Sequence, residues 1–92
     1  MRFGCLLAVL IATVLAGEAD ARSRAARNEF QRHHPCPANG NSRGPCPGWQ
    51  VDHITPLKCG GEDHMRNMQW LTVSDHREKT RFEAVTGCRL YR

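Results

Sequence analysis

Four of the five cysteines in this very short chain, those beyond the apolar N-terminal run that holds Cys5, set the tightest limit on how this protein can fold. The chain has 92 residues. That is enough for one small domain and too few for a two-domain enzyme, a dinucleotide-binding sheet or a barrel. Beyond residue 21, only 22 of 71 residues are apolar, which is a small share for a self-sufficient core. Cross-links are therefore expected to supplement hydrophobic burial.

The pattern of these cysteines, Cys36, Cys46, Cys59 and Cys88, favours two disulfides. The alternative is a structural zinc site, but such sites usually place their thiolates in C-x₂₋₄-C pairs, and the chain has none. Three pairings are possible. We prefer Cys36–Cys46 with Cys59–Cys88, because neighbouring cysteines in a loop meet at low entropic cost; the spacing alone leaves the other two open.

The first 21 residues have the form of a secretory signal peptide. A basic start at Met1-Arg2 precedes an apolar run over 5–15, and Ala19-Asp20-Ala21 matches the A-x-A cleavage pattern. The alternative is a membrane anchor, but the run is too short to cross about 30 Å of hydrocarbon comfortably. We expect cleavage after Ala21 and a secreted or periplasmic protein, with no membrane contact after cleavage.

Cleavage would also change the charge. It removes one basic and two acidic residues, so the net charge rises from +4 to +5. A small basic protein suggests a polyanionic partner, which could be nucleic acid, anionic lipid or a polysaccharide. A membrane-active toxin is disfavoured, because the candidate helices have small apolar faces, Ala26/Phe30 and Phe82/Val85.

The rest of the sequence predicts a small α+β domain. A basic helix is expected over 22–34, where Arg22, Arg24, Arg27 and Arg32 form either a solvated face or a clamp for DNA, followed by a turn-rich loop over 35–48. Strands are expected over 49–54 and 68–73, joined through Gly60-Gly61, and then a helix from Asp75 to a stop at Gly87. Asp75 and Glu78 have capping-box spacing. The expected core consists of Trp49, Met68, Trp70, Phe82 and Val85.

On this frame, Asp52 and His53 end the first strand, Asn67 opens the second, and His76 lies in the first turn of the helix. A carboxylate and an imidazole, Asp52 and His76, suit one divalent cation with positions left for water and a phosphate oxygen. Since side chains alternate along a strand, His53 would point elsewhere and could act as a base. Lys79 and Thr80 follow His76 by three and four residues and could contact phosphate. These parts suit phosphodiester hydrolysis.

The same segment resembles the HNH endonuclease family. Val51 to Thr80 carries D-H-x-x-P, a Gly-Gly loop, N-x-Q-x-L and H-x-x-K-T, and the chain also resembles small exported HNH proteins in its H-P-C-P and C-P-G loops. The resemblance implies a ββα-metal (His-Me) finger, with His53 activating water and Asp52 and His76 holding one divalent ion, which could be Mg, Mn, Zn or Ni. It implies that Asn67 either fixes the inter-strand loop or joins the metal shell.

The resemblance divides the chain into a signal peptide (1–21), a basic helix with its Cys/Pro/Gly-rich loop (22–48) and a nuclease core (49–92). It implies DNA as the partner of a chain expected to be a monomer without a small-molecule cofactor. The sequence departs from many members, which carry CxxC zinc pairs and a cysteine where this chain has Asp75. The alternative function is a non-catalytic, disulfide-stapled, nucleic-acid-binding module. His33, His34 and His64 are expected at the surface, with a minor possibility that His64 touches DNA.

Overall fold

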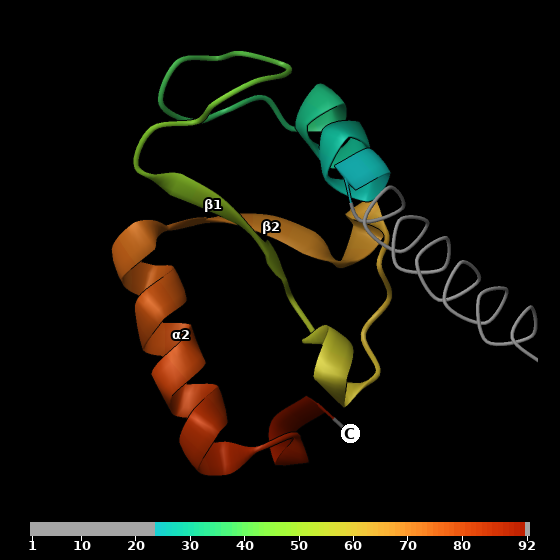
Figure 1. Cartoon of the computed structure of the whole chain (residues 1–92), viewed down its shortest axis with the longest axis vertical. Coiled ribbons are helices and arrows are strands. Elements are labelled where there is room, and N and C mark those ends of the chain that lie inside the picture. The colour runs from blue at the N-terminus through green and yellow to red at the C-terminus, as the bar shows by residue number, and fades with distance from the viewer. Residues whose placement is uncertain (1–23, 92) are drawn as a thin grey trace, which may run out of the picture.

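Two short strands and one long helix form the second half of the chain (Figure 1). The computed structural model describes residues 24–91, so the expected signal peptide lies outside the described residues. Strand β1 spans Trp49–His53, β2 spans Met68–Thr72 and α2 spans Val73–Thr86. Single turns of 3-10 helix lie at Leu57–Cys59, Met65–Asn67 and Arg89–Tyr91. The order strand, loop, strand, helix is the predicted one, and the architecture is the expected ββα fold.

The two strands form an antiparallel ribbon whose faces carry different chemistry. Asp52 lies opposite Gln69, and Val51 opposite Trp70. Because side chains alternate along a strand, these two pairs face opposite sides of the ribbon. The Asp52 side faces α2, since Asp52 contacts Lys79 of that helix. The Trp70 side faces the N-terminal part of the chain.

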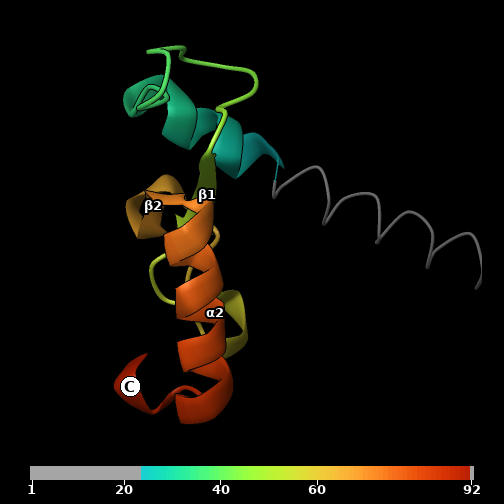
Figure 2. The same ribbon diagram turned by 90° about the vertical axis from the view of Figure 1, so that its left-hand side faces the viewer.

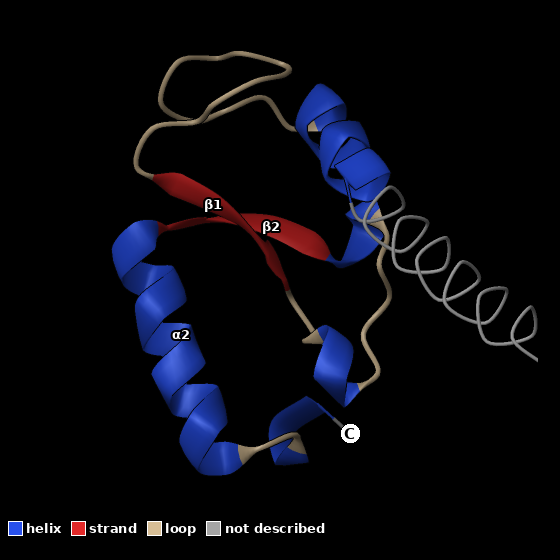
Figure 3. Ribbon diagram, in the orientation of Figure 1, coloured by secondary structure: helices blue, strands red, loops and turns tan. Residues whose placement is uncertain are grey.

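That N-terminal part begins with a helix whose described residues are 24–33, drawn beside the ribbon on the side away from α2 (Figure 3). Phe30 is buried and packs on Trp70, with ring centroids 5.5 Å apart, and the Trp70 indole nitrogen donates to the His34 carbonyl at 2.7 Å. The turn-rich loop that follows is closed by the disulfide Cys36–Cys46. Residues 22–23 of the expected helix lie outside the described residues.

Helix α2 begins two residues earlier than expected. The hydroxyl of Thr72 accepts a hydrogen bond from the Asp75 backbone nitrogen at 3.0 Å, so Thr72 is the N-cap and the expected box of Asp75 with Glu78 is wrong. Asp75 instead occupies the first turn, where its negative charge interacts favourably with the positive end of the helix dipole. The helix ends at Thr86, with Gly87 as its C-cap as predicted. Figure 2 shows α2 in front of the strands, with the ribbon at its upper end and most of the helix extending past it toward the C-terminus.

The core differs from the expected one. Met68 is buried as predicted, and Phe30 and Cys36 are the other buried apolar residues among 24–91. Trp49 and Trp70, which were also expected in the core, are only partly buried. Phe82 and Val85 were expected in the core but are 51% and 85% exposed, so that expectation is wrong. The physical reason is that α2 turns a charged face to the ribbon: its only buried residue is Glu83.

The second disulfide, Cys59–Cys88, ties the turn after β1 to the segment after α2. Both bridges follow the preferred pairing. Closing a loop of this length contributes on the order of 3 to 4 kcal/mol by limiting the unfolded chain. That helps to offset the scarcity of buried apolar residues. Among residues 24–91, no helix combines the length and apolarity needed to cross a membrane.

Candidate active site

Asp52 is the centre of a polar cluster between β1 and α2. Its residue is 6% exposed, a burial that a carboxylate tolerates only with partners. The amide nitrogen of Gln69 donates to Oδ2 at 3.1 Å, and the Lys79 ammonium lies 3.0 Å from the same oxygen. The His76 Nε2 lies 3.7 Å from Oδ1. The contacts from Gln69 and Lys79 to Oδ2 orient the Asp52 carboxylate so that Oδ1 lies toward His76.

His53 points away from this cluster, as strand alternation predicts. Its Nε2 lies 3.1 Å from Oδ1 of Asp63, a residue of the inter-strand loop, and its side chain is 20% exposed. Which ring nitrogen carries the hydrogen depends on this contact: a carboxylate acceptor favours the hydrogen on Nε2. The lone pair is then on Nδ1.

Asn67 is bound to the loop backbone through its whole amide group. Its Oδ1 accepts from the Thr55 nitrogen at 3.0 Å, and its Nδ2 donates to the carbonyls of Thr55 and Glu62, each at 2.9 Å. Gly61 lies against the same place, because a Cβ there would overlap the Thr55 carbonyl. Asn67 thus joins the two ends of the loop that carries Asp63.

Lys79 is mostly buried, with 18% of its side chain exposed. Its ammonium donates to the His53 carbonyl at 2.8 Å and to Asp52, and it lies 3.6 Å from Glu83 Oε1. The Tyr91 ring covers it, with the centroid 5.8 Å from Nζ. Lys79 is therefore engaged in fixing the strand end. The hydroxyl of Thr80, the other expected phosphate contact, donates to the His76 carbonyl at 2.9 Å.

Asp52, His76 and Lys79 lie in the wall of a shallow pocket of about 300 Å³. It is lined by Val51, Asp52, His53, Pro56, Leu57, Lys58, His76, Lys79 and Glu83. One buried atom in it lacks a partner among the described residues: Oε2 of Glu83. This unpaired oxygen adds negative potential to the inner wall. The lining as a whole holds the carboxylates of Asp52 and Glu83 and the ammonium groups of Lys58 and Lys79.

The two residues that the sequence predicts to hold the divalent ion, Asp52 and His76, both line this pocket. Among residues 24–91, no three His, Cys, Asp or Glu side chains are grouped so that they could hold a metal. Asp52 and His76 form a pair of suitable donors, and the ammonium beside Asp52 shows that this carboxylate faces positive charge. Divalent ions such as Mg²⁺ often take few protein ligands and fill the other positions with water and phosphate oxygens.

The sequence did not indicate three side chains near the site: Asp63, Gln69 and Glu83. Gln69 was noted only as part of a motif, not as the partner of Asp52. Glu83 follows Lys79 by four residues, a spacing that places two helical side chains together. That spacing could have indicated it. Asp63 lies in an irregular loop, where no periodicity indicates direction.

In a comparison with known families, the model for the HNH endonuclease family matches residues 25–82. This covers more than half of the chain, including both strands and the helix as far as Phe82. Comparisons with curated proteins and with solved structures give no match.

Proposed function

Because the chain belongs to the HNH endonuclease family, we propose that it hydrolyses phosphodiester bonds in DNA with one divalent cation, and that His53 is the base. The observation that carries the proposal is the division of labour at the end of β1. Asp52 turns to His76 of α2, whereas His53 turns to Asp63 in the loop. The Asp52–His76 pair could hold a cation, and the His53–Asp63 pair could accept a proton from water and stabilise the resulting charge.

The imidazole of His53 would take the proton of the attacking water at Nδ1. Asp63 accepts the hydrogen of Nε2 and would stabilise the imidazolium once the proton has been transferred. Asp63 is in turn held by the loop that Asn67 closes. Asp63 and Asn67 would act as positioning residues, and His53 as the catalytic one.

A divalent cation, when bound, would stabilise the charge that develops on the transferring phosphate and on the leaving oxygen. Asp52 and His76 would hold it. Gln69 fixes the rotation of the Asp52 carboxylate through a hydrogen bond, and Lys79 fixes the strand end through the His53 carbonyl. These two side chains would keep the donor pair and the base in a constant relation.

Export of the protein is part of the proposal. The apolar N-terminal run supports it. The two disulfides support it independently, because disulfides persist in secreted and periplasmic proteins and are rare in the reducing cytosol.

The function is tested by incubating purified, oxidised protein with supercoiled plasmid. We expect conversion to nicked or linear DNA with Mg²⁺ or Mn²⁺, and none with excess EDTA. Restoring the cation should restore cleavage. Retention of plasmid in a gel without cleavage under any divalent ion would instead support the non-catalytic binding module.

A further inference from the structure

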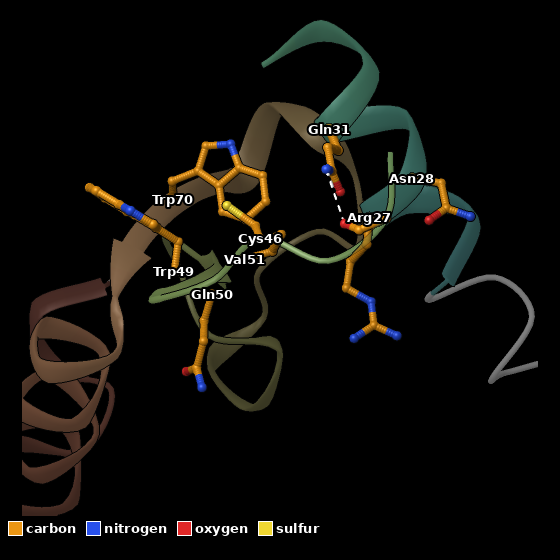
Figure 4. Close-up of a pocket in the computed structure, with 9 residues that line it drawn as sticks. Arg27, Asn28, Gln31, Cys46, Trp49, Gln50, Val51 and Trp70 are labelled. Carbon is orange, nitrogen blue, oxygen red and sulfur yellow. Dashed lines mark hydrogen bonds between the residues drawn. The ribbon is translucent and has the colours of Figure 1, made fainter. Parts of the chain in front are cut away.

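A second cleft lies on the ribbon face away from α2, between the strands and the helix over 24–33 (Figure 4). Its volume is about 400 Å³. It is lined by Arg27, Asn28, Gln31, Gly44, Cys46, Trp49, Gln50, Val51 and Trp70. The function proposed above assigns nothing to it.

The cleft is aromatic on one side and held rigid there. Its lining includes Trp49 and Trp70, and the chain has only two tryptophans. Trp70 is fixed by its hydrogen bond to the His34 carbonyl and by its packing on Phe30. Both indoles remain partly exposed. A fixed, partly exposed indole is a platform on which a nucleobase can stack.

The opposite side of the cleft is polar and cationic. The amide nitrogen of Gln31 donates to the carbonyls of Asn41 and Gly44, at 3.1 and 3.2 Å, while its oxygen accepts no hydrogen bond from residues 24–91. That oxygen is available to the N–H group of a base. Arg27 forms no ion pair within the same residues, so its guanidinium is available to a phosphate.

Arg32, on the same helix, is differently placed. Hydrogen bonds from His33 and Arg32 hold the pKa of Glu29 below its ordinary value, so this carboxylate stays ionised and neutralises Arg32. The free positive charge at the cleft is thus that of Arg27.

The cleft and the Asp52 pocket lie on either side of β1 and share one lining residue. Val51 lines both, and it precedes Asp52 in β1. β1 pairs only with β2 among the described residues, so its other edge is open. A DNA strand crossing that edge would place one nucleotide in the cleft and a neighbouring phosphate near His53.

We propose that this cleft binds an unpaired nucleobase of the strand being cut, so that single-stranded DNA, or DNA with unpaired nucleotides beside the cut, is the preferred substrate. The inference rests on the proposed nuclease function. A base inside an intact duplex is covered by its neighbours and cannot stack on an indole without leaving the helix.

Intrinsic fluorescence tests the proposal, because both tryptophans line the cleft. The protein is titrated in EDTA, which prevents cleavage, with oligothymidine of about ten nucleotides and with a blunt duplex of two fully complementary strands of equal phosphate content. We expect saturable quenching by oligothymidine, with a Kd at least roughly tenfold lower than for the duplex. Equal quenching by the two, or none, would overturn the proposal.

Two matched pairs of variants locate the binding. Trp49→Leu should weaken oligothymidine binding about tenfold, and Trp49→Phe less, because a phenyl ring still stacks. Arg27→Gln should weaken it severalfold more than Arg89→Gln, which removes the same charge from the turn after α2. Binding, read from the mobility of a labelled oligonucleotide, that is unchanged in Trp49→Leu would contradict the inference.

The two proposals fail separately. Metal-dependent cleavage with no preference for unpaired DNA would refute the cleft and leave the nuclease intact. Specific quenching without cleavage under any divalent ion would refute the nuclease and leave the cleft as a nucleic-acid site.

Discussion

Lys79 is the residue whose role the structure changes most. The sequence placed it near the phosphate, but its ammonium lies against Asp52 and the His53 carbonyl. The Lys79 ammonium therefore lies beside the carboxylate that would also hold a divalent cation. Like charges in a poorly solvated pocket repel one another, so Lys79 should weaken cation binding while it stabilises the protein without metal.

The substitution Lys79→Met separates these two effects. We expect Mn²⁺ affinity, measured by isothermal titration calorimetry, to rise severalfold. The free energy of unfolding in EDTA should fall by about 2 to 3 kcal/mol, because Asp52 loses its main cationic partner.

The matched control is Arg77→Gln, which removes the same charge from an exposed position of α2. It should change neither quantity appreciably. Weaker Mn²⁺ binding by Lys79→Met would show that Lys79 supports the cation rather than competing with it.

The substitution Asn67→Asp distinguishes the two roles expected for Asn67, which are to fix the inter-strand loop or to join the metal shell. In Asn67→Asp the acceptor oxygen stays, but the donations to the Thr55 and Glu62 carbonyls are lost. We expect urea unfolding in EDTA to show a loss of about 2 kcal/mol, since two carbonyls lose their donor. Unchanged stability in EDTA together with altered metal affinity would instead place Asn67 in the metal shell.

At the scale of elements, the sequence predicted the strands, their order and the end of α2, because each has a local signal: alternation, a Gly-Gly loop, or a terminal glycine. The start of α2 was misplaced because Thr72 and Asp75 both have capping spacing within T-V-S-D-H-R-E. In the structure Thr72 is the cap, and its hydroxyl accepts the hydrogen bond from the Asp75 nitrogen. A propensity-based reading cannot choose between two caps three residues apart.

The packing of α2 could not be predicted from apolar periodicity at all. Phe82 and Val85 point to solvent, while His76, Lys79 and Glu83 face the ribbon. These three recur at helical spacing, but they are held by partners distant in sequence, chiefly Asp52. Such long-range contacts leave no local signal in the sequence, so the packing of Lys79 against Asp52 could not be predicted.

The Cys59–Cys88 disulfide is the element-scale device that holds the end of α2 to the site. It anchors the segment that carries Tyr91 over Lys79. Replacing both cysteines by serine should lower the free energy of unfolding by about 3 to 4 kcal/mol. Urea titration of the oxidised proteins measures this. An unchanged unfolding midpoint would show that the bridge adds nothing to stability.

At the scale of the whole molecule, a thin core is combined with two disulfides and a buried charge network. The buried apolar residues are few among those described, and each end of the ribbon is closed by a bridge or a bonded loop. In this molecule the Asp52 pocket and the aromatic cleft lie on opposite faces of the ribbon, and Val51 of β1 lines both. The net charge of the full chain, +4, suits a polyanionic substrate.

The central claim is that His53 activates the water that cuts DNA. The most direct measurement is the initial rate of plasmid nicking at saturating Mn²⁺ for the parent protein, His53→Ala and His33→Ala, the last being an exposed histidine of the N-terminal helix. We expect His53→Ala to be slower by roughly 100-fold or more, with unchanged Mn²⁺ affinity, and His33→Ala to match the parent. A His53→Ala protein that nicks plasmid as fast as the parent would contradict the account.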